Sequence, residues 1–137
     1  MASHGMPMNM KTNTPTRIIG ALLLALAGTA AADEVPFDQA SYAQAVAAGK
    51  PVVVYLHADW CPTCRAQQPI VDRLSKEPGF KQVTIFVADF DKETALEKSL
   101  KVTQQSTFVV FRKGHEVTRS TGQTAEPAIR AVLQQAL

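Results

Sequence analysis

The sequence predicts an α/β fold in which a mixed β-sheet is flanked by helices in a three-layer sandwich. Short apolar runs rich in β-branched residues alternate with helix-like segments over residues 37–100. Two more such runs follow, joined by a turn at 113–115, which is typical of an antiparallel hairpin. Strand–helix–strand units pair their strands in parallel, so parallel and antiparallel pairs should share one sheet.

The first 32 residues are expected to be a signal peptide. Lys11 and Arg17 are their only charges, residues 18–28 are apolar without a break, and residues 30–32 form an Ala-x-Ala cleavage site. The apolar run is shorter than the roughly 20 residues that a membrane span needs. An uncleaved membrane anchor is the alternative interpretation, and no span is expected after cleavage.

Residues 33–137 are expected to form one domain. Without the signal peptide, that domain has as many basic as acidic residues and no basic cluster with interleaved aromatic residues, so nucleic-acid binding is not expected. Export would place the protein in the periplasm or outside the cell, where disulfides form and persist. Met8 and Met10 are both candidate start residues, which would make the residues before them additional to the natural chain.

The elements are predicted from periodicity and from start and stop residues. Asp38 is a candidate N-cap of the first helix and Gly49 its stop. Ala66, Ile70 and Leu74, at four-residue intervals, predict the second helix. In chain order, the sequence predicts a helix over 37–49, a strand over 51–57, a helix from about 62 to 76 ended by residues 77–80, a strand over 82–89, a helix over 92–100, strands over 107–112 and 116–121, and a helix from about 124.

The two cysteines of the chain, Cys61 and Cys64, follow the strand over 51–57 where the next helix begins. Pro62 suits the first helical position, where a backbone N–H would have no partner. The unpaired N–H groups and the helix dipole then face the Cys61 sulfur and lower its pKa, and the thiolate is the attacking species. Cys64, one turn further on, is placed to resolve a mixed disulfide. The pattern therefore predicts a redox couple.

Two other uses of the cysteines are alternatives to a redox couple. A structural disulfide would close a loop of only four residues, which gains little stability. A metal site needs about four ligands, and His57 and His115 are the only histidines of the predicted domain. A metal shared between two chains stays open as an alternative. The acidic residues of 89–93 are expected to cap a loop rather than to bind a metal.

The W-C-P-T-C stretch, residues 60–64, resembles the active site of the thioredoxin superfamily, and the likeness extends over about residues 37–137. Residues 49–61 (GKPVVVYLHADWC) look most like the C-terminal domain of the DsbD electron-transfer proteins, and the motif also resembles CcmG-type reductants of cytochrome c maturation. Pro69 matches the helix-kinking proline of the family, and residues 107–117 match its hairpin.

The resemblance implies a thiol–disulfide oxidoreductase that reduces protein disulfides and receives electrons from an upstream thiol–disulfide donor. Cys61 would be the nucleophile and Cys64 the resolving thiol, with no bound cofactor because the pair itself carries two electrons. Trp60 would cover the motif and form part of a docking surface, or would be an ordinary packed aromatic residue. Pro62 and Thr63, between the cysteines, are candidate groove or tuning residues.

The sequence departs from the family at two positions. The acid that often assists proton transfer is replaced by Tyr55, and a phenol with a pKa near 10 is a poor base. The cis-proline of the family is replaced by Ser106, followed by Thr107. Because a cis bond before a non-proline residue costs roughly 2.5–4 kcal/mol, we expect a trans bond and a reshaped substrate groove at this point.

Two smaller expectations complete the site. His57 would tune the thiolate or, alternatively, be a partly buried packing residue. The rival to the enzyme is a thioredoxin-like binding module in which Cys61 and Cys64 of two chains share a metal or an iron–sulfur cluster. The observation that motivates this rival is Ser106, because loss of the proline would open the sulfurs to metal ions.

Overall fold

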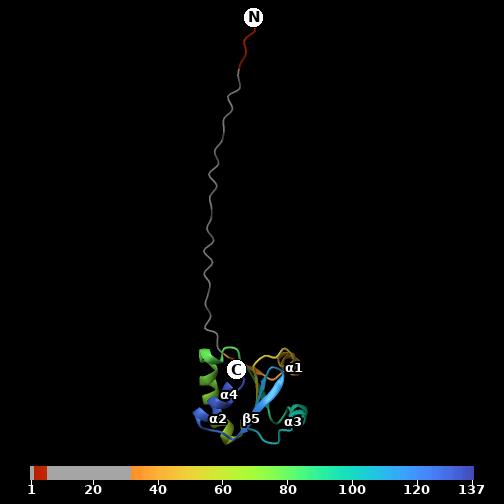
Figure 1. Ribbon diagram of the computed structural model, residues 1–137, viewed down its shortest axis with the longest axis vertical. Helices are drawn as coiled ribbons and strands as arrows, with labels where there is room; N and C mark the ends of the chain where they lie inside the picture. Colours follow the sequence, from red (N-terminus) through yellow and green to blue (C-terminus); the bar gives the residue numbers. More distant parts are fainter. Residues whose placement is uncertain (1, 6–31) are drawn as a thin grey trace.

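A mixed sheet forms the middle layer of the structure, with helices on either side (Figure 1). It has five strands in the order β1-β3-β2-β4-β5. β3 pairs in parallel with both β1 and β2, whereas β2–β4 and β4–β5 are antiparallel, as the sequence predicts for a mixed sheet. The elements are β1 (Asp33–Pro36), α1 (Gln39–Ala47), β2 (Val52–His57), α2 (Pro62–Ser75), the short 3-10 helix η1 (Pro78–Phe80), β3 (Thr84–Asp89), α3 (Thr94–Leu100), β4 (Thr107–Arg112), β5 (His115–Thr121) and α4 (Glu126–Gln134).

This computed structural model describes residues 2–5 and 32–137. The predicted signal peptide, residues 1–32, therefore lies almost entirely outside the described residues. Within them, no helix is both long enough and apolar enough to cross a membrane.

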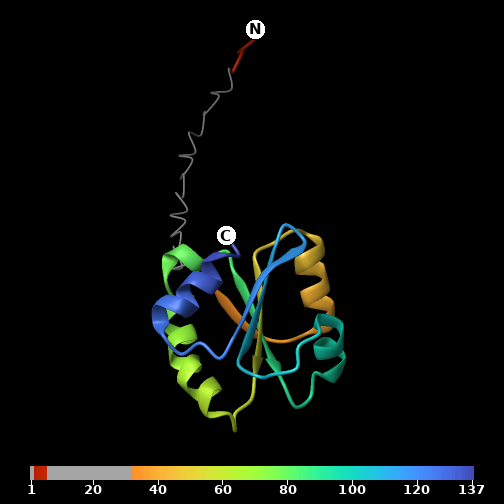
Figure 2. The same cartoon turned by 60° about the horizontal axis from the view of Figure 1, so that its bottom comes forward.

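The helices cover both faces of the sheet, with α2 and α4 on one side and α1 and α3 on the other (Figure 2). β2 is the central strand, and its side chains alternate between the two cores. Val53 and Tyr55 pack toward α2 and α4, while Val52, Val54 and Leu56 pack toward α1 and α3. All five are fully buried, so β2 is a rigid support for whatever follows its C-terminal end.

The first helix begins and ends as its sequence predicts. The Asp38 carboxylate accepts the Ser41 backbone N–H at 2.8 Å, so Asp38 is the N-cap of α1. The chain turns out of the helix at Gly49, whose φ of 70° lies in the left-handed region that favours glycine.

β1 was not predicted. It is a four-residue edge strand that contains two acids and a proline, and it lacks the apolar run by which the other parallel strands are recognised. Ala32, the residue before it, is buried, and its N–H donates to the Ser75 carbonyl oxygen at 2.7 Å. The residue before β1 thus joins this edge of the sheet to the end of α2.

The predicted helix is present as α2, but its buried face does not follow the four-residue spacing of Ala66, Ile70 and Leu74. Ala66 is exposed and Ile70 only partly buried, although Leu74 is buried. The fully buried residues of the helix follow a spacing of three and four: Cys64, Gln67, Val71 and Leu74. A glutamine in this row hides the pattern from an analysis of apolar residues alone.

Candidate active site

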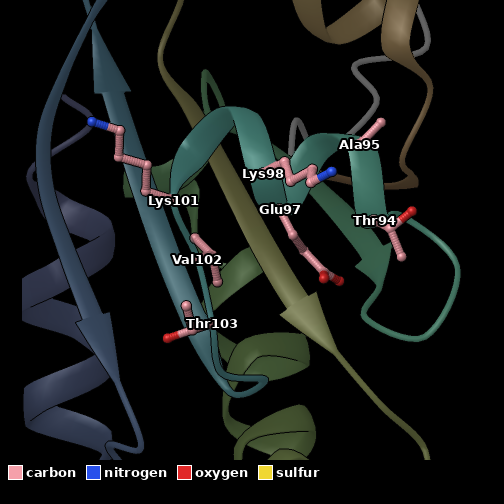
Figure 3. Close-up of a pocket in the computed structure, with 7 residues that line it drawn as sticks. All are labelled: Thr94, Ala95, Glu97, Lys98, Lys101, Val102 and Thr103. Carbon is pink, nitrogen blue, oxygen red and sulfur yellow. The ribbon is translucent and has the colours of Figure 1, made fainter.

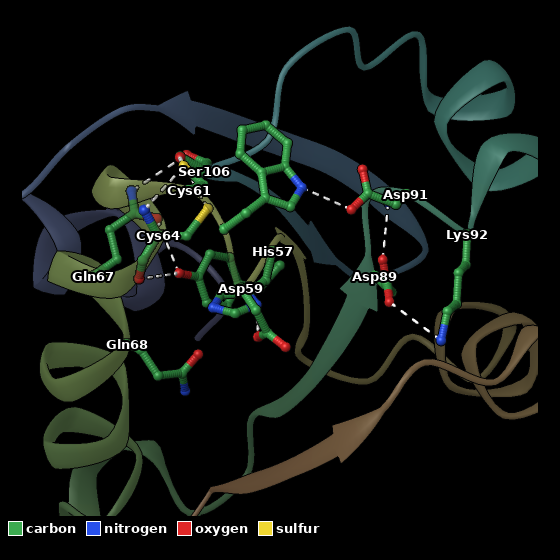
Figure 4. A network of polar contacts seen from close by, with 12 residues as sticks. His57, Asp59, Cys61, Cys64, Gln67, Gln68, Asp89, Asp91, Lys92 and Ser106 are labelled. Atoms are coloured by element: carbon green, nitrogen blue, oxygen red, sulfur yellow. Dashed lines mark hydrogen bonds and ion pairs between the residues drawn. The ribbon is translucent and has the colours of Figure 1, made fainter.

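Cys61 is the N-cap of α2, one loop after the end of β2 (Figure 4). Its Sγ accepts the Cys64 backbone N–H at 3.3 Å, and Pro62 occupies the first turn of the helix. The Cys61 N–H donates to the Ala58 carbonyl oxygen at 3.1 Å, which holds the loop that presents the cysteine. The predicted position of the sulfur at the positive end of a helix is therefore the position that the structure has.

The two thiols are both free and buried, but their pKa values move in opposite directions. Burial raises the pKa of Cys61, yet hydrogen bonds from the Ser106 hydroxyl and from the Cys64 N–H outweigh it and lower the pKa to about 7. Burial also raises the pKa of Cys64. The hydrogen bond with Ser106 lowers this pKa, but by less than burial raises it. Near neutral pH, Cys61 is thus the thiol that ionises first.

Ser106 brings its hydroxyl against both sulfurs. Its Oγ lies 3.2 Å from Cys61 Sγ and 3.1 Å from Cys64 Sγ. The described residues contain no cis peptide bond, so the bond before Ser106 is trans, as expected. Its φ of 60° is left-handed, a conformation that costs a non-glycine residue about 1–2 kcal/mol. The Ser106 carbonyl oxygen accepts hydrogen bonds from Gln67 Nε2 and from the Gly122 N–H, which hold the loop in this shape.

Gln67 is a fully buried polar residue that the sequence analysis missed. Its Oε1 accepts the Tyr55 hydroxyl at 3.0 Å, and its Nε2 donates to the carbonyl oxygens of Ser106 at 3.3 Å and Gln123 at 2.8 Å. The amide therefore connects β2, α2, the Ser106 loop and the segment before α4. Its spacing of three from Cys64 and four from Val71 was the available signal.

Tyr55 occupies the position of the family's acid as a buried core residue. Its ring stacks on Phe108 with centroids 4.5 Å apart, and its hydroxyl also lies 3.3 Å from the Cys64 carbonyl oxygen. Burial is the main cause that raises the pKa of Tyr55, and the charge of the nearby cysteine sulfurs raises it further. At neutral pH the phenol is a hydrogen-bond donor, and it does not supply the base that the family's carboxylate supplies.

Trp60 lies on the rim of the site with 57% of its surface exposed. Its Nε1 donates to Asp91 Oδ2 at 2.7 Å, and the Asp91 N–H donates to Asp89 Oδ1 at 2.9 Å. Asp89 thus caps this loop (Figure 4), as expected, whereas Glu93 makes no side-chain cap. The bond by which Asp91 fixes the indole was not predicted.

His57 and Thr107 form their polar contacts with groups other than the sulfurs. His57 is largely buried beside the Tyr55 ring, with its Nδ1 3.5 Å from Asp59 Oδ1. Thr107 Oγ1 donates to the Gln104 carbonyl oxygen at 2.8 Å and bonds Thr121 Oγ1 at 2.9 Å, so it braces the base of the Ser106 loop.

A small open hollow of about 260 Å³ lies beside the nucleophile position. Its lining is mostly polar, and Thr63 borders it together with residues of the facing loop and the end of β5. The lining residues are Cys61, Thr63, Gln104, Gln105, Ser106, Thr121 and Gly122. The loop therefore presents the Ser106 hydroxyl and amide groups to this hollow, at the place where the family has a proline ring.

In the described part of the chain, no group of three or more His, Cys, Asp or Glu side chains is placed to hold a metal. Cys61 and Cys64 would supply two sulfurs, fewer than the four ligands of a closed zinc site.

The first cysteine ionises at a helix N-terminus, its partner is buried one turn later, and both follow the central strand of a mixed sheet, which is the arrangement of a thioredoxin-fold thiol–disulfide oxidoreductase. The family model described as Thioredoxin matches residues 33–135. The chain belongs to the thioredoxin family.

Known relatives agree with this assignment. Thioredoxin Asp f 29 of Aspergillus fumigatus is 32% identical over 84 residues, which cover 61% of this chain and 76% of the relative. The crystal structure of Trxlp from Edwardsiella tarda superposes with a TM-score of 0.71 at 37% identity, covering 74% of this chain and 98% of that one. The thioredoxin of Malassezia sympodialis has a TM-score of 0.68 at 22% identity, over 77% of this chain and 91% of its own, and shows the shared fold.

Proposed function

We propose that this thioredoxin-family protein is exported and reduces disulfides in other proteins. The observation that carries the proposal is the asymmetry of the two thiols, since Cys61 ionises near neutral pH while the pKa of buried Cys64 is raised. A reductase needs this order, with one thiolate ready to attack and a second thiol that acts only after the first has reacted.

The chemistry requires two exchange steps and no bound cofactor. The Cys61 thiolate attacks one sulfur of a substrate disulfide, forming a mixed disulfide and expelling the other substrate sulfur. Cys64 then attacks Cys61, the internal disulfide forms, and the second substrate sulfur leaves. The substrate gains the two electrons that the cysteine pair loses. An upstream thiol–disulfide donor would restore the dithiol.

The surface around Cys61 supports a protein substrate. The polar hollow beside it is lined by the loop that carries Ser106, which supplies polar groups to an extended substrate segment. Trp60, exposed and held by Asp91, provides an apolar contact on the rim. Because the sulfurs themselves are nearly covered, a substrate must bring its disulfide into this hollow.

Export and direction rest on the sequence. The charged start, apolar run and Ala-x-Ala site of residues 1–32 support secretion to an oxidising compartment. The resemblance of residues 49–61 to DsbD, and of the motif to CcmG-type reductants, supports reduction as the direction of electron flow. A metal-sharing module is not favoured, because the relatives are thioredoxins and the Ser106 hydroxyl already contacts both sulfurs.

Insulin reduction by the purified protein, with dithiothreitol as electron donor, tests the activity. We expect Cys61→Ser to abolish turnover and Cys64→Ser to accumulate mixed disulfides through Cys61, with the remote Ser99→Ala variant as the control. Turnover that survives Cys61→Ser would refute the reductase. Metal content per chain, measured on the same sample, would reveal the rival module as a metal bound in proportion to protein and lost in both cysteine variants.

Two further measurements address direction and export. Equilibration with glutathione should give a potential close to the roughly −270 mV of thioredoxin, whereas a value near −120 mV would indicate an oxidant. Expression of the full chain in a bacterial host, followed by N-terminal sequencing of the periplasmic fraction, should give a start at Asp33. Full-length protein in the cytoplasm would contradict export.

A further inference from the structure

We propose that Ser106 is a catalytic residue whose hydroxyl passes a proton from the Cys64 thiol to the departing substrate sulfur. The inference rests on the proposed reductase function and concerns its second exchange step. The site lacks the family's proton-accepting acid, because Tyr55 occupies that position.

The geometry of Ser106 suits a relay. Its Oγ is within hydrogen-bonding distance of both sulfurs, 3.1 Å from Cys64 and 3.2 Å from Cys61. A hydroxyl carries one proton and two lone pairs, so it accepts one hydrogen bond while donating another. With Cys61 ionised, the consistent arrangement is a chain in which Cys64 S–H donates to Oγ and Oγ–H donates to the Cys61 thiolate.

The loop holds the hydroxyl in this place. Ser106 is only 4% exposed, and its carbonyl oxygen is fixed by Gln67 Nε2 and by the Gly122 N–H. The left-handed backbone at this residue turns the side chain toward the sulfurs and needs those two bonds to persist. A proline at this position would have no side-chain hydroxyl at all.

The titratable groups that surround Cys64 do not replace the relay. Cys61 is part of the disulfide during the second step and has no thiolate to accept a proton. The Tyr55 hydroxyl, from β2, donates a hydrogen bond to Gln67 and is not a base at neutral pH. Asp72 of α2 and Glu34 of β1 raise the pKa of Tyr55 by their charge, but neither has a hydrogen bond to a cysteine sulfur among the described residues.

The step balances without any further reactant. In the mixed disulfide, Cys64 Sγ attacks Cys61 Sγ and gives its proton to Ser106 Oγ. The Cys61–Cys64 bond forms, the bond between Cys61 and the substrate sulfur breaks, and the electron pair goes to that sulfur. The original Ser106 hydroxyl proton moves to the same sulfur, so the substrate leaves as a thiol and the serine is regenerated.

The hollow beside Cys61 places the substrate sulfur on the correct side. Ser106 lines it together with Cys61, so a substrate sulfur bonded to Cys61 Sγ within it lies next to Oγ. Proton transfer by a positioned group contributes typically 10²–10⁴-fold to a rate. A serine that relays would show this effect in the resolving step.

The test follows resolution of a Cys61–glutathione mixed disulfide, prepared chemically on the full protein, by the release of glutathione between about pH 6 and pH 9. Ser106→Ala removes the hydroxyl and keeps the Cβ, whereas Ser106→Gly removes both and accommodates the left-handed backbone without strain. The loss of the bond to the Cys61 thiolate does not affect this step, because Cys61 carries no charge in the mixed disulfide.

We expect both variants to release glutathione about 10²-fold more slowly than the native protein near pH 6. This deficit should shrink steadily toward pH 9, because the small fraction of Cys64 that solvent ionises grows with pH and needs no relay, although burial keeps the pKa of Cys64 raised. Ser99→Ala should match the native protein throughout. Native rates in both variants, or a slowing by the same factor at every pH, would overturn the relay. The preparation of the mixed disulfide bypasses protein reduction, so the relay is tested separately from the proposed function: loss of insulin reduction in the native protein would refute the latter alone.

Discussion

The Tyr55 hydroxyl and the Gln67 amide oxygen lie 3.0 Å apart inside the core, and the same amide reaches the Ser106 carbonyl oxygen. Through this one side chain the central strand, the active-site helix and the loop opposite the cysteines are hydrogen-bonded to each other. A buried polar group is stabilising only while its partners are present, so the pair makes the site sensitive to changes that do not touch a sulfur.

Replacement of Gln67 by leucine should lower the free energy of unfolding by about 2–3 kcal/mol, because it leaves buried polar partners unsatisfied. Those partners are the Tyr55 hydroxyl and the carbonyl oxygens of Ser106 and Gln123. Urea unfolding of the reduced protein measures the change. Gln134→Leu, the same substitution on the exposed surface of α4, should change it by less than about 0.5 kcal/mol. Equal effects at the two positions would contradict the role assigned to the buried amide.

Tyr55→Phe should cost about 1 kcal/mol of stability through the lost hydrogen bond to Gln67. It should leave the rate of mixed-disulfide resolution within about two-fold of native. The phenol donates a hydrogen bond to Gln67, so it is not the group that accepts the Cys64 proton. Stopped-flow kinetics and urea unfolding measure the two effects. Tyr42→Phe, which removes a half-buried hydroxyl from the other core, is the control for stability. A large kinetic loss in Tyr55→Phe would make the tyrosine a participant in proton transfer.

Alkylation of the reduced protein by iodoacetamide should modify Cys61, with a rate that rises through a midpoint near pH 7. Cys64 should react far more slowly, because it has no exposed surface and burial raises its pKa. The pKa of Cys61 is lowered by a hydrogen bond from Ser106, so Ser106→Ala should move the midpoint to higher pH. Ser99→Ala should not move it. A midpoint that is unchanged in Ser106→Ala would show that the hydroxyl does not stabilise the thiolate.

Asp91→Ala should raise the KM for a protein disulfide about five-fold, because the exposed Trp60 loses the hydrogen bond that orients it, worth about 1 kcal/mol. A small aliphatic disulfide, which does not reach the rim, should be reduced at the native rate. Asp59→Ala removes one negative charge from a fully exposed neighbour of Trp60 and leaves the indole bond intact, so it separates charge from orientation. If both variants raise KM equally, charge alone is responsible.

Much of the fold follows from pattern. β2, β3 and β4 are continuous apolar runs, and α1 has both a carboxylate cap and a glycine stop, so local sequence and tertiary structure agree there. β1 could not be predicted because this edge strand is stabilised by pairing with β3. Its four residues include two acids and a proline, so they lack the apolar pattern of a strand. The position of Cys61 as a helix cap was predictable because Pro62 marks the first turn.

The network around the cysteines could not be predicted in the same way. Gln67 is buried because partners from β2 and two loops converge on its amide, and these lie 12, 39 and 56 residues away in sequence. Asp91 meets Trp60 across 31 residues for a similar reason. The sequence of α3 likewise does not predict how Glu97 is placed. Glu97 borders a hollow of about 470 Å³ (Figure 3), and its Oε1 is buried with no hydrogen-bond partner among the described residues.

The burial of Ala32 has a consequence for the order of events in the cell. A protease that cuts before Asp33 must hold the chain extended in its own active site, yet in the folded domain the Ala32 N–H is bound to Ser75 and Asp33 is paired with β3. If the predicted signal peptide is removed there, cleavage has to come before the first strand docks. A chain whose first strand docks before cleavage would then keep its leader.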